Sequence, residues 1–579
     1  MASIEIIDTV AKGGSTITFN YTTLAELNPA EFRTFFRGIT TVAEYQNNQQ
    51  ATLVSTNASA FPGETDFHYT ATISANAQFN RPLQLGDRVE VEISQFLLAP
   101  RHGRANYYGT VILYVVGQGI VPWASSATQV DAANMANNGP VVGNVRTNLD
   151  SYPMPTNGWL GGLTTLPYQY SDEPSNHFKE FAGNISPTNG FPFMLGRRLH
   201  HTDFGDGTHS EPDNPVFTEQ IGKLGPRFIN RSCVACHVNN GRALPPAIGA
   251  PMLQSAVKVG SDANGARHPT LGSVLQPQST TGSPEGGVTI ASYTTTSGQY
   301  GDGTPYTLQK PNYTFSGITP AFFSVRLAPQ LVGMGLLEAV SESTIQALAD
   351  PNDADHDGIS GRIQTVVDPE TGQPRLGRFG YKGGKARVSH QIAGAYNTDM
   401  GVTSPIFPVL DDGTSNAIPE VSLDDIDKLN RYVTLLGVSA RRSLNDPQAL
   451  QGEQLFASAN CVKCHTATLT TSPYHPMTEL RNQVIHPYTD LLLHDLGPGL
   501  ADNMGEASAS GSEWRTAPLW SIGLTAGISG GEAYLHDGRA RSLEEAILWH
   551  DGEAAASREI FRTMSATERA ALIKFLKSL

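Results

Sequence analysis

The sequence lacks long hydrophobic runs and has a deficit of basic residues. No window reaches the roughly eighteen consecutive apolar residues of a membrane-spanning helix, so a helical span is excluded. The N-terminal segment MASIEIIDTV has no basic region followed by an apolar one, and we expect that any export signal has been removed. Lys and Arg number 39 against 54 Asp and Glu, which gives a net charge of −15. Such an acidic protein lacks the basic surface that nucleic acids require.

Cysteine is the scarcest informative residue, with four in 579 residues. All four fall in two copies of a C-x-x-C-H motif, at Cys233–His237 and Cys461–His465, so none remains for a structural disulfide. In this motif two thiols bond covalently to a haem and the histidine ligates its iron. A redox dithiol or a zinc site would explain the cysteine pairs but not a histidine after each pair. The sequence therefore predicts two covalent c-type haems, attached through Cys233, Cys236, His237, Cys461, Cys464 and His465.

The attachment chemistry also predicts a compartment. Haem is attached to such motifs outside the bacterial cytoplasm, so we expect a periplasmic or secreted protein. With 39% hydrophobic residues, a chain of this length has enough apolar material for about two to four domains.

Residues 1–125 predict a β-sandwich-like accessory domain, because short runs at 15–21, 67–73, 88–97 and 109–116 alternate polar and apolar residues. Residues 126–160 are rich in Asn, Gly and Pro and predict a linker.

Two mainly α-helical cytochrome c-type haem domains are expected to follow, at 161–440 and 441–579. Asp446 and Pro447 are typical of a helix start, and Ser565 with Glu568 has capping-box spacing. Arg326–Pro329 precedes a glycine-basic segment at 383–387, just as Arg515–Pro518 precedes 537–541. This repeat predicts related domains, the first enlarged by an insertion that includes the Ser/Thr/Gly-rich stretch 270–318.

Several motifs resemble a known family. CHVNNGRALPP, RLAPQLVGMGLLEAV, GRFGYKGGKA, DMGVTSPIFP and YLHDGRARSLEEAI are similar to the di-haem oxidoreductase and peroxidase branch of the bacterial di-haem cytochrome c peroxidase superfamily. The likeness covers about residues 180–579 and leaves out the β-rich region. It implies that the first haem reacts with peroxide and that the second passes or stores electrons.

The resemblance also implies a sixth iron ligand at the second haem. The family places that ligand, usually Met or Tyr, at the end of the helix after the glycine-basic motif, where this sequence has His550. The alternative is that His550 is a surface residue and that Met477 or Met504 is the ligand.

At the first haem, Gln391 and Asp399 match the amide and carboxylate that the superfamily places over the open iron face. Cleavage of a peroxide O–O bond requires a proton to move from the inner to the outer oxygen, so Asp399 is the expected acid–base group and Gln391 an orienting one. The alternative for Asp399 is a helix cap or turn. Tyr381 matches an aromatic relay between the haems and is otherwise a core residue.

Two questions stay open at the level of ligands. His390 is a candidate resting ligand of the first haem, with weaker candidates at His200, His201 and His268. Asp353, Asp355 and Asp357 have the spacing of the first half of an EF-hand loop, although its twelfth position is Gln364. They predict either a calcium site or a solvated acidic turn.

Three classes of function fit these observations. The first is an oxidoreductase that uses hydrogen peroxide or dioxygen and takes electrons from a small redox protein or another donor. The second is an electron-transfer cytochrome without peroxidase activity. The third, compatible with both, is attachment of the haem module to a partner or polymer through the β-rich domain.

Overall fold

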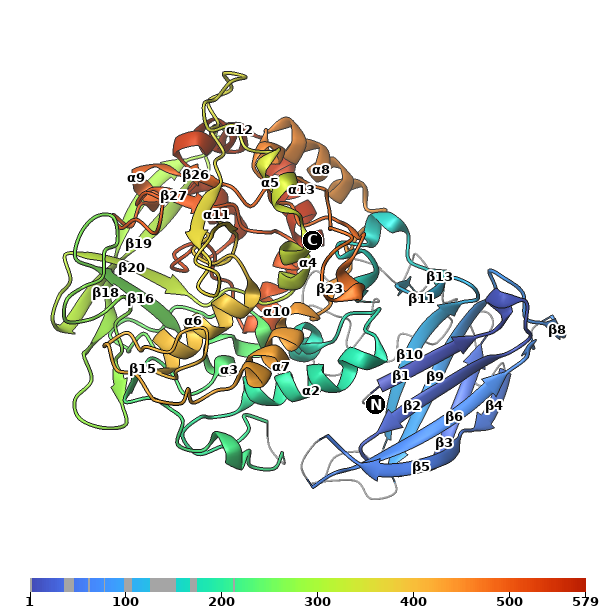
Figure 1. Ribbon diagram of the computed structural model, residues 1–579. Coiled ribbons are helices and arrows are strands. Elements are labelled where there is room, and N and C mark those ends of the chain that lie inside the picture. The colour runs from blue at the N-terminus through green and yellow to red at the C-terminus, as the bar shows by residue number, and fades with distance from the viewer. Residues whose placement is uncertain are drawn as a thin grey trace.

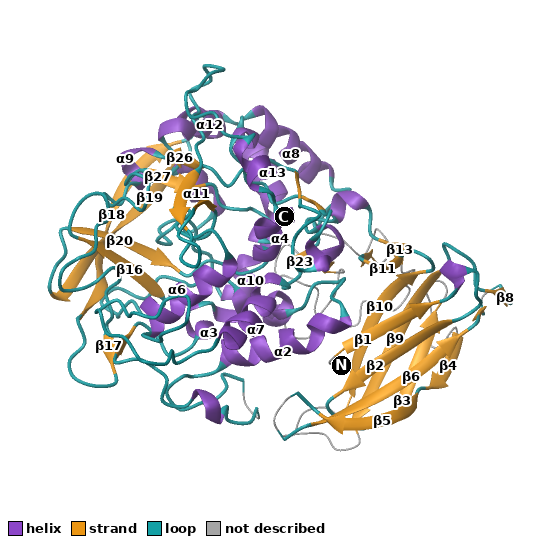
Figure 2. Cartoon of the chain, in the orientation of Figure 1, coloured by secondary structure: helices purple, strands orange, loops and turns teal. Residues whose placement is uncertain are grey.

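The computed structural model describes residues 3–35, 46–60, 63–77, 79–97, 107–124, 152–166, 174–211 and 214–579. A β-rich N-terminal part lies beside a larger part that holds the helices (Figure 1). Colouring by secondary structure shows the same division, with further strands at the edge of the larger part (Figure 2). Within the described residues, no helix combines the length and apolarity needed to cross a bilayer.

The N-terminal part consists of two antiparallel sheets. Alternating residues turn inward, and their side chains form one core, in which the rings of Phe19 and Phe32 lie 5.0 Å apart. The β-rich prediction for this part is confirmed. The first sheet has the order β1 (Ser3–Asp8), β2 (Ile17–Thr23), β6 (Thr65–Ile73), β5 (Thr52–Ala58), and the second β11 (Gly119–Val121), β10 (Tyr107–Val115), β9 (Arg88–Leu97), β3 (Leu27–Phe35), β4 (Gln46–Gln50).

The predicted linker lies largely outside the described residues. Within 126–160, the structure describes 152–160, where Met154 and Leu160 are buried. β12 (Trp123–Ala124) pairs with β13 (Tyr152–Pro153), and β7 (Ala75–Asn76) with β8 (Arg81–Pro82). The domain boundaries at 125, 160 and 440 stay predictions.

Short helices and small two-stranded sheets make up the larger part. Its helices are α2 (Pro187–His201), α3 (Cys233–Cys236), α4 (Met334–Ala339), α5 (Glu342–Gln346), α6 (Val388–Met400), α7 (Leu423–Thr434), α8 (Pro447–Ser458), α9 (Gly497–Leu500), α10 (Thr525–Ser529), α11 (Leu543–Leu548), α12 (Ala555–Thr563) and α13 (Ala566–Ser578). Its paired strands are β14 (Thr165–Leu166) with β23 (Val438–Ser439), β15 (Arg227–Phe228) with β17 (Gln278–Ser279), β16 (Ser255–Gly260) with β20 (Phe322–Leu327), β18 (Gly286–Gln299) with β19 (Pro305–Gly317), β21 (Gln364–Val367) with β22 (Pro374–Gly377), β24 (Leu469–Thr470) with β25 (Val484–Ile485), and β26 (Leu493–Asp495) with β27 (Glu513–Arg515).

Two helix pairs frame the two C-x-x-C-H motifs: α2 packs against α7, and α8 against α13 (Figure 1). Each pair crosses at a glycine. A side chain at Gly196 in α2 would collide with the Lys428 carbonyl of α7, and one at Gly452 in α8 would collide with the Ala571 carbonyl of α13. The backbones can approach so closely only because glycine has no Cβ. We call these the first and the second helix pair.

The predicted helix starts are confirmed. The Asp446 side chain accepts hydrogen bonds from the backbone N–H groups of Gln448 and Ala449, and Pro447 occupies the first turn of α8. Ser565 and Glu568 form a reciprocal capping box at the start of α13. Both helices of the second pair therefore begin at positions that local side chains fix.

Residues 255–327 differ from the expectation of a mainly helical first haem domain. They fold as β16–β20 and a long hairpin, β18–β19, over a small core of their own. The strands of the hairpin are rich in Thr and Tyr, residues that favour β-structure.

The tip of this hairpin contacts the helices at the other end of the sequence. The Arg569 guanidinium of α13 lies 3.8 Å from the centre of the Tyr300 ring and forms an ion pair of 2.9 Å with Asp302. Gly301 N–H donates to the carbonyl of Arg562 in α12 at 2.8 Å, and the Arg562 guanidinium donates to the carbonyl of Gln299 at 2.6 Å. The hairpin thus joins the insertion to the C-terminal helices.

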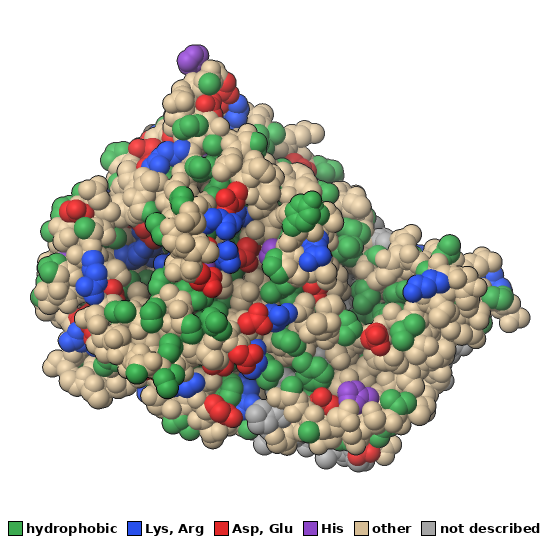
Figure 3. All heavy atoms as spheres, in the orientation of Figure 1, with side chains coloured by type: hydrophobic (Ala, Val, Ile, Leu, Met, Phe, Trp, Pro, Cys, Tyr) green, Lys and Arg blue, Asp and Glu red, His purple; other side chains and the backbone are tan. Residues whose placement is uncertain are grey.

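Basic and acidic side chains intermingle on the face of the described residues shown in Figure 3. This distribution agrees with the acidic composition, which gave no basis for a nucleic-acid surface.

Candidate functional site

The two C-x-x-C-H motifs line one cavity of about 720 Å³ inside the larger part. All four cysteines are free thiols. Burial, the largest influence, raises the pKa of Cys233, Cys236 and Cys461 to about 12. The structure therefore brings together the residues that the sequence predicts to attach both haems.

The histidine of each motif has its ring fixed by a backbone carbonyl. His237 Nδ1–H donates to the Pro329 carbonyl at 2.7 Å, and His465 Nδ1–H donates to the Tyr488 carbonyl at 2.9 Å. Burial lowers the pKa of both imidazoles, that of His465 to about 4, so the rings are neutral. A neutral imidazole that donates from Nδ1 keeps the Nε2 lone pair for a metal.

The two carbonyl acceptors do not come from matching positions of the predicted repeat. Pro329 belongs to the Arg326–Pro329 motif, whereas the second acceptor is Tyr488 and not Pro518 of the matching Arg515–Pro518 motif. Arg515 instead donates to the carbonyl of Gly380 at 3.0 Å. The two motifs therefore have similar sequences but make different contacts.

The donor set fits two haems. Each motif offers two thiols and one imidazole whose Nε2 is available, all on one cavity. Basic side chains also line the cavity at Lys258, Arg326 and Lys385, where they surround Glu506. Buried positive charge in excess of its carboxylates suits a group that carries its own carboxylates, as haem does.

His550 lies at the second motif, as its place in the sequence predicts. It follows α11, lines the cavity and acts electrostatically on His465. Its Nδ1–H donates to the Ala546 carbonyl at 2.7 Å, which leaves Nε2 available, and burial lowers its pKa. Neither Met477 nor Met504 lines the cavity, and the sulfur of Met477 instead accepts a hydrogen bond from Thr434 at 3.2 Å.

Gln391 and Asp399 lie on α6 and both line the cavity near the first motif. The Asp399 carbonyl accepts hydrogen bonds from Ile229 and Asn230, just before Cys233, and its carboxylate raises the pKa of both Cys233 and Cys236. Burial raises the pKa of Asp399 to about 6, although a hydrogen bond from Thr398 and the charge of Lys258 oppose the shift. A carboxyl group with such a pKa can both take and give a proton near neutral pH.

Tyr381 belongs to an aromatic group that sequence reasoning found only in part. Its hydroxyl donates to the Leu327 carbonyl at 3.0 Å, and its ring meets Trp514 edge-on at 6.5 Å. Trp514 stacks on His536 at 3.9 Å and 12°. All three line the cavity. Trp514 precedes the second R-x-A-P motif and His536 precedes its glycine-basic segment. This proximity is the signal in the sequence that could have identified both residues.

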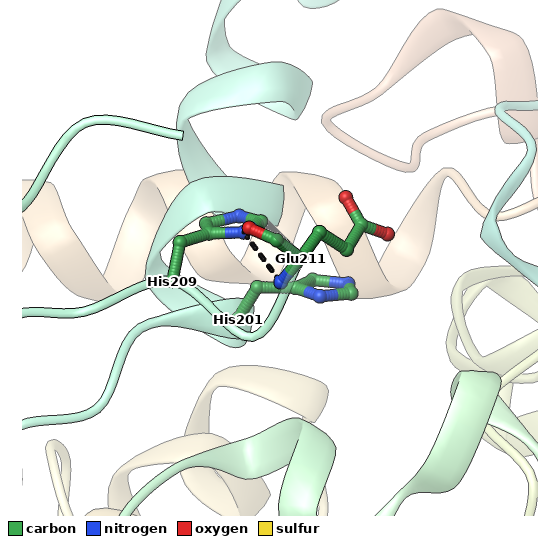
Figure 4. Close-up of side chains that lie close together, drawn as sticks. All are labelled: His201, His209 and Glu211. Atoms are coloured by element: carbon green, nitrogen blue, oxygen red, sulfur yellow. Dashed lines mark hydrogen bonds between the residues drawn. The ribbon is translucent and has the colours of Figure 1, made fainter. Parts of the chain in front are cut away.

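Three of the four candidate resting ligands of the first haem are placed outside the cavity lining. His390, His201 and His268 do not line the cavity. His390 points to Glu370, with 2.9 Å between His390 Nε2 and Glu370 Oε2, and His201 packs against His209 beside Glu211 (Figure 4).

His200 does line the cavity and is fully buried, and neither of its ring nitrogens has a hydrogen-bond partner. Burial lowers its pKa well below 6.5. It lies four residues after Gly196, at the place that Phe456 takes after Gly452, and Phe456 packs 6.1 Å from the ring of His465. The charge of His237 also contributes to the lowered pKa of His200, so the two rings lie near each other, and the role of His200 as a resting ligand stays a prediction.

The predicted calcium loop already has a cation. Lys463, inside the second motif, lies 2.9 Å from Asp357 and 3.4 Å from Asp355. Asp353 accepts hydrogen bonds from the N–H groups of Asp357 and Gly358 instead, and Gln364 is buried against the carbonyls of Lys382 and Glu506. Calcium binding stays a prediction.

Comparison with known proteins places the C-terminal part in a family. The model of the family described as "di-haem oxidoreductase, putative peroxidase" matches residues 319–579. The match supports the resemblance to that family over this part of the chain. No curated protein and no solved structure matches the chain. The matched residues include the second C-x-x-C-H motif, Asp399 and His550, whereas the first motif precedes them.

Proposed function

We propose that this di-haem oxidoreductase is a peroxidase-like enzyme with two covalent c-type haems. The first, held by Cys233, Cys236 and His237, is the place where hydrogen peroxide or dioxygen reacts. The second, held by Cys461, Cys464 and His465, transfers electrons or stores an oxidising equivalent. Haem supplies the one-electron and oxygen chemistry when bound. The attachment chemistry supports a periplasmic or secreted location, and a small redox protein is the expected electron donor.

The observation that carries this proposal is the partly buried carboxyl group of Asp399 beside the first motif. Its raised pKa, about 6, allows it to take the proton of a bound peroxide and to give that proton to the departing oxygen. Gln391, on the same helix, offers an amide that can orient the oxygen atoms. Near the second motif, the corresponding feature is the imidazole of His550, which would ligate the iron of a haem held there and limit the access of substrate.

The test compares Asp399→Asn with wild type in reaction with hydrogen peroxide, followed by stopped-flow absorbance. Asparagine keeps the shape and loses the proton carrier, so the rate should fall by about 10²–10⁴-fold. Gln391→Leu should have a smaller effect. Asp412→Asn removes an exposed carboxylate that caps a turn and serves as the matched control.

The pH dependence gives a second check. Since Asp399 must be ionised to accept a proton, the wild-type rate should fall as pH drops through about 6, and Asp399→Asn should lose this dependence. A wild-type rate in Asp399→Asn would refute the acid–base assignment. A wild type that never reacts with peroxide would favour an electron-transfer cytochrome instead.

A further inference from the structure

A cluster of carboxylates and an imidazole lies at the start of α6, on the side away from the cavity. Asp368 and Glu370 come from the turn between β21 and β22, and His390 comes from the first turn of α6. One donor atom from each residue lies within 4.8 Å of the other two. Three donors from two separate elements thus converge on one point.

Asp368 carries an oxygen whose bonding is incomplete. Its side chain is 0% exposed, and Oδ1 accepts hydrogen bonds from the N–H groups of Glu370 at 2.9 Å and Thr371 at 3.1 Å. Oδ2 is buried and accepts no hydrogen bond, although the guanidinium of Arg387 lies 3.5 Å from it. A buried carboxylate oxygen is normally hydrogen-bonded, and this one has only the longer ion pair with Arg387, which also lies 3.8 Å from Glu370.

His390 and Glu370 complete the set. His390 is 1% exposed, and its Nε2 lies 2.9 Å from Glu370 Oε2. Glu370 is 41% exposed, so an ion can reach the cluster from solvent and the carboxylate can shift to receive it. Arg387 is also 41% exposed and can turn outward when another cation takes its place.

A second histidine–carboxylate cluster differs in how closely cations pair with its carboxylate. His201, His209 and Glu211 also lie close together (Figure 4), but Arg197 at 2.6 Å and Lys179 at 3.4 Å neutralise Glu211. His209 Nδ1 accepts the Glu211 backbone N–H at 3.1 Å. The two imidazoles are nearly parallel, at 9°, so their lone pairs do not converge on one ion.

We propose that Asp368, Glu370 and His390 bind one divalent transition-metal ion such as Zn²⁺ or Mn²⁺. One imidazole and two carboxylates are ligands that both ions accept, with water in the remaining positions. The ion would tie the β21–β22 turn to the first turn of α6, the helix that carries Gln391 and Asp399. The site does not depend on the haem chemistry.

The experiment loads chelator-treated, haem-containing full-length protein with Zn²⁺ or Mn²⁺, dialyses it and measures metal by mass spectrometry. Wild type should retain one ion per chain in excess of its two irons, and the ion should raise the melting temperature in a saturable manner. Glu370→Gln should weaken binding by at least about 100-fold, since it removes a direct ligand. Because Glu370 is half exposed, this variant should fold even where Asp368→Asn does not.

His209→Gln is the matched control, because it alters the other histidine–carboxylate cluster. It should bind the ion as wild type does. The proposal is overturned if wild type retains no ion, or if Glu370→Gln and His390→Gln bind it with unchanged affinity and stabilisation.

Discussion

The first and second helix pairs pack in the same way, but different side chains of each pair line the cavity. Each pair crosses at a glycine, Gly196 or Gly452, and four residues later each places a ring beside the histidine of its motif. In the second pair that ring is Phe456, which packs on His465 and Phe575. In the first it is His200, a neutral imidazole with two unsatisfied nitrogens.

The rest of the cavity follows the same division. Asp399, Gln391 and Lys258 line it near the first motif, whereas Leu543, Phe561 and Leu572 line it together with His550, and His494 lies 3.6 Å from Cys464 of the second motif. A common scaffold thus carries a carboxyl group and an amide near one motif and imidazoles among apolar side chains near the other. This difference is what the proposed division of labour requires, because a reactive iron needs proton carriers and an electron store needs isolation from substrate.

The largest expected effect is the loss of one of the two haems that the comparison concerns. Replacing Cys461 and Cys464 together with alanine should remove the second haem completely, because no thioether can form, and leave the first in place. Mass spectrometry of the denatured protein should show one attached haem instead of two. The matching change at Cys233 and Cys236 should leave the other one. Retention of both haems in either variant would contradict covalent attachment.

The next effect concerns the ligand that distinguishes the two irons. His550→Ala should convert a low-spin signal into a high-spin one in the electron paramagnetic resonance spectrum of the oxidised protein, since the iron loses one imidazole. The signal of the other haem should not change. Met477→Leu is the control, because Met477 lies away from the cavity. An unchanged spectrum in His550→Ala would exclude His550 as the ligand.

The sequence predicted the local features of this division and missed those that depend on distant contacts. The C-x-x-C-H motifs, the Asp446 cap and the place of His550 are defined by residues a few positions apart. The stack of Trp514 on His536 and the carbonyl of Tyr488 near His465 join segments that only the fold brings together. The hairpin was not predicted, because its Thr-rich strands lie in a stretch that was described only by its Ser, Thr and Gly content.

A smaller effect tests whether the two crossings are equivalent. Gly196→Ala and Gly452→Ala each place a methyl group against a backbone carbonyl that cannot move away, so each should lower the free energy of unfolding by about 1–3 kcal/mol. Gly499→Ala, whose new methyl group would make only ordinary contacts with Trp549, is the control. Denaturant unfolding measures all three. A loss at only one crossing would show that the pairs are not equivalent.

The smallest expected effect comes from exchanging the two rings, His200 and Phe456, that differ between the helix pairs. His200→Phe should raise the free energy of unfolding by about 1 kcal/mol, because it removes two buried nitrogens without partners. Phe456→His should lower it by at least as much. Thermal unfolding of the haem-containing proteins measures both. A destabilised His200→Phe would show that His200 has a bonding partner when haem is bound.

Because of the hairpin β18–β19, segments that are far apart in the sequence would stay associated after a cut in the chain. Its tip, at Tyr300–Asp302, is fastened to Arg562 and Arg569 on helices that close the second half of the larger part. A protease that cut the chain between the two helix pairs would therefore leave a nicked molecule whose pieces stay together. Separation of the pieces would require a cut in the hairpin itself or the loss of its ion pair and ring contact.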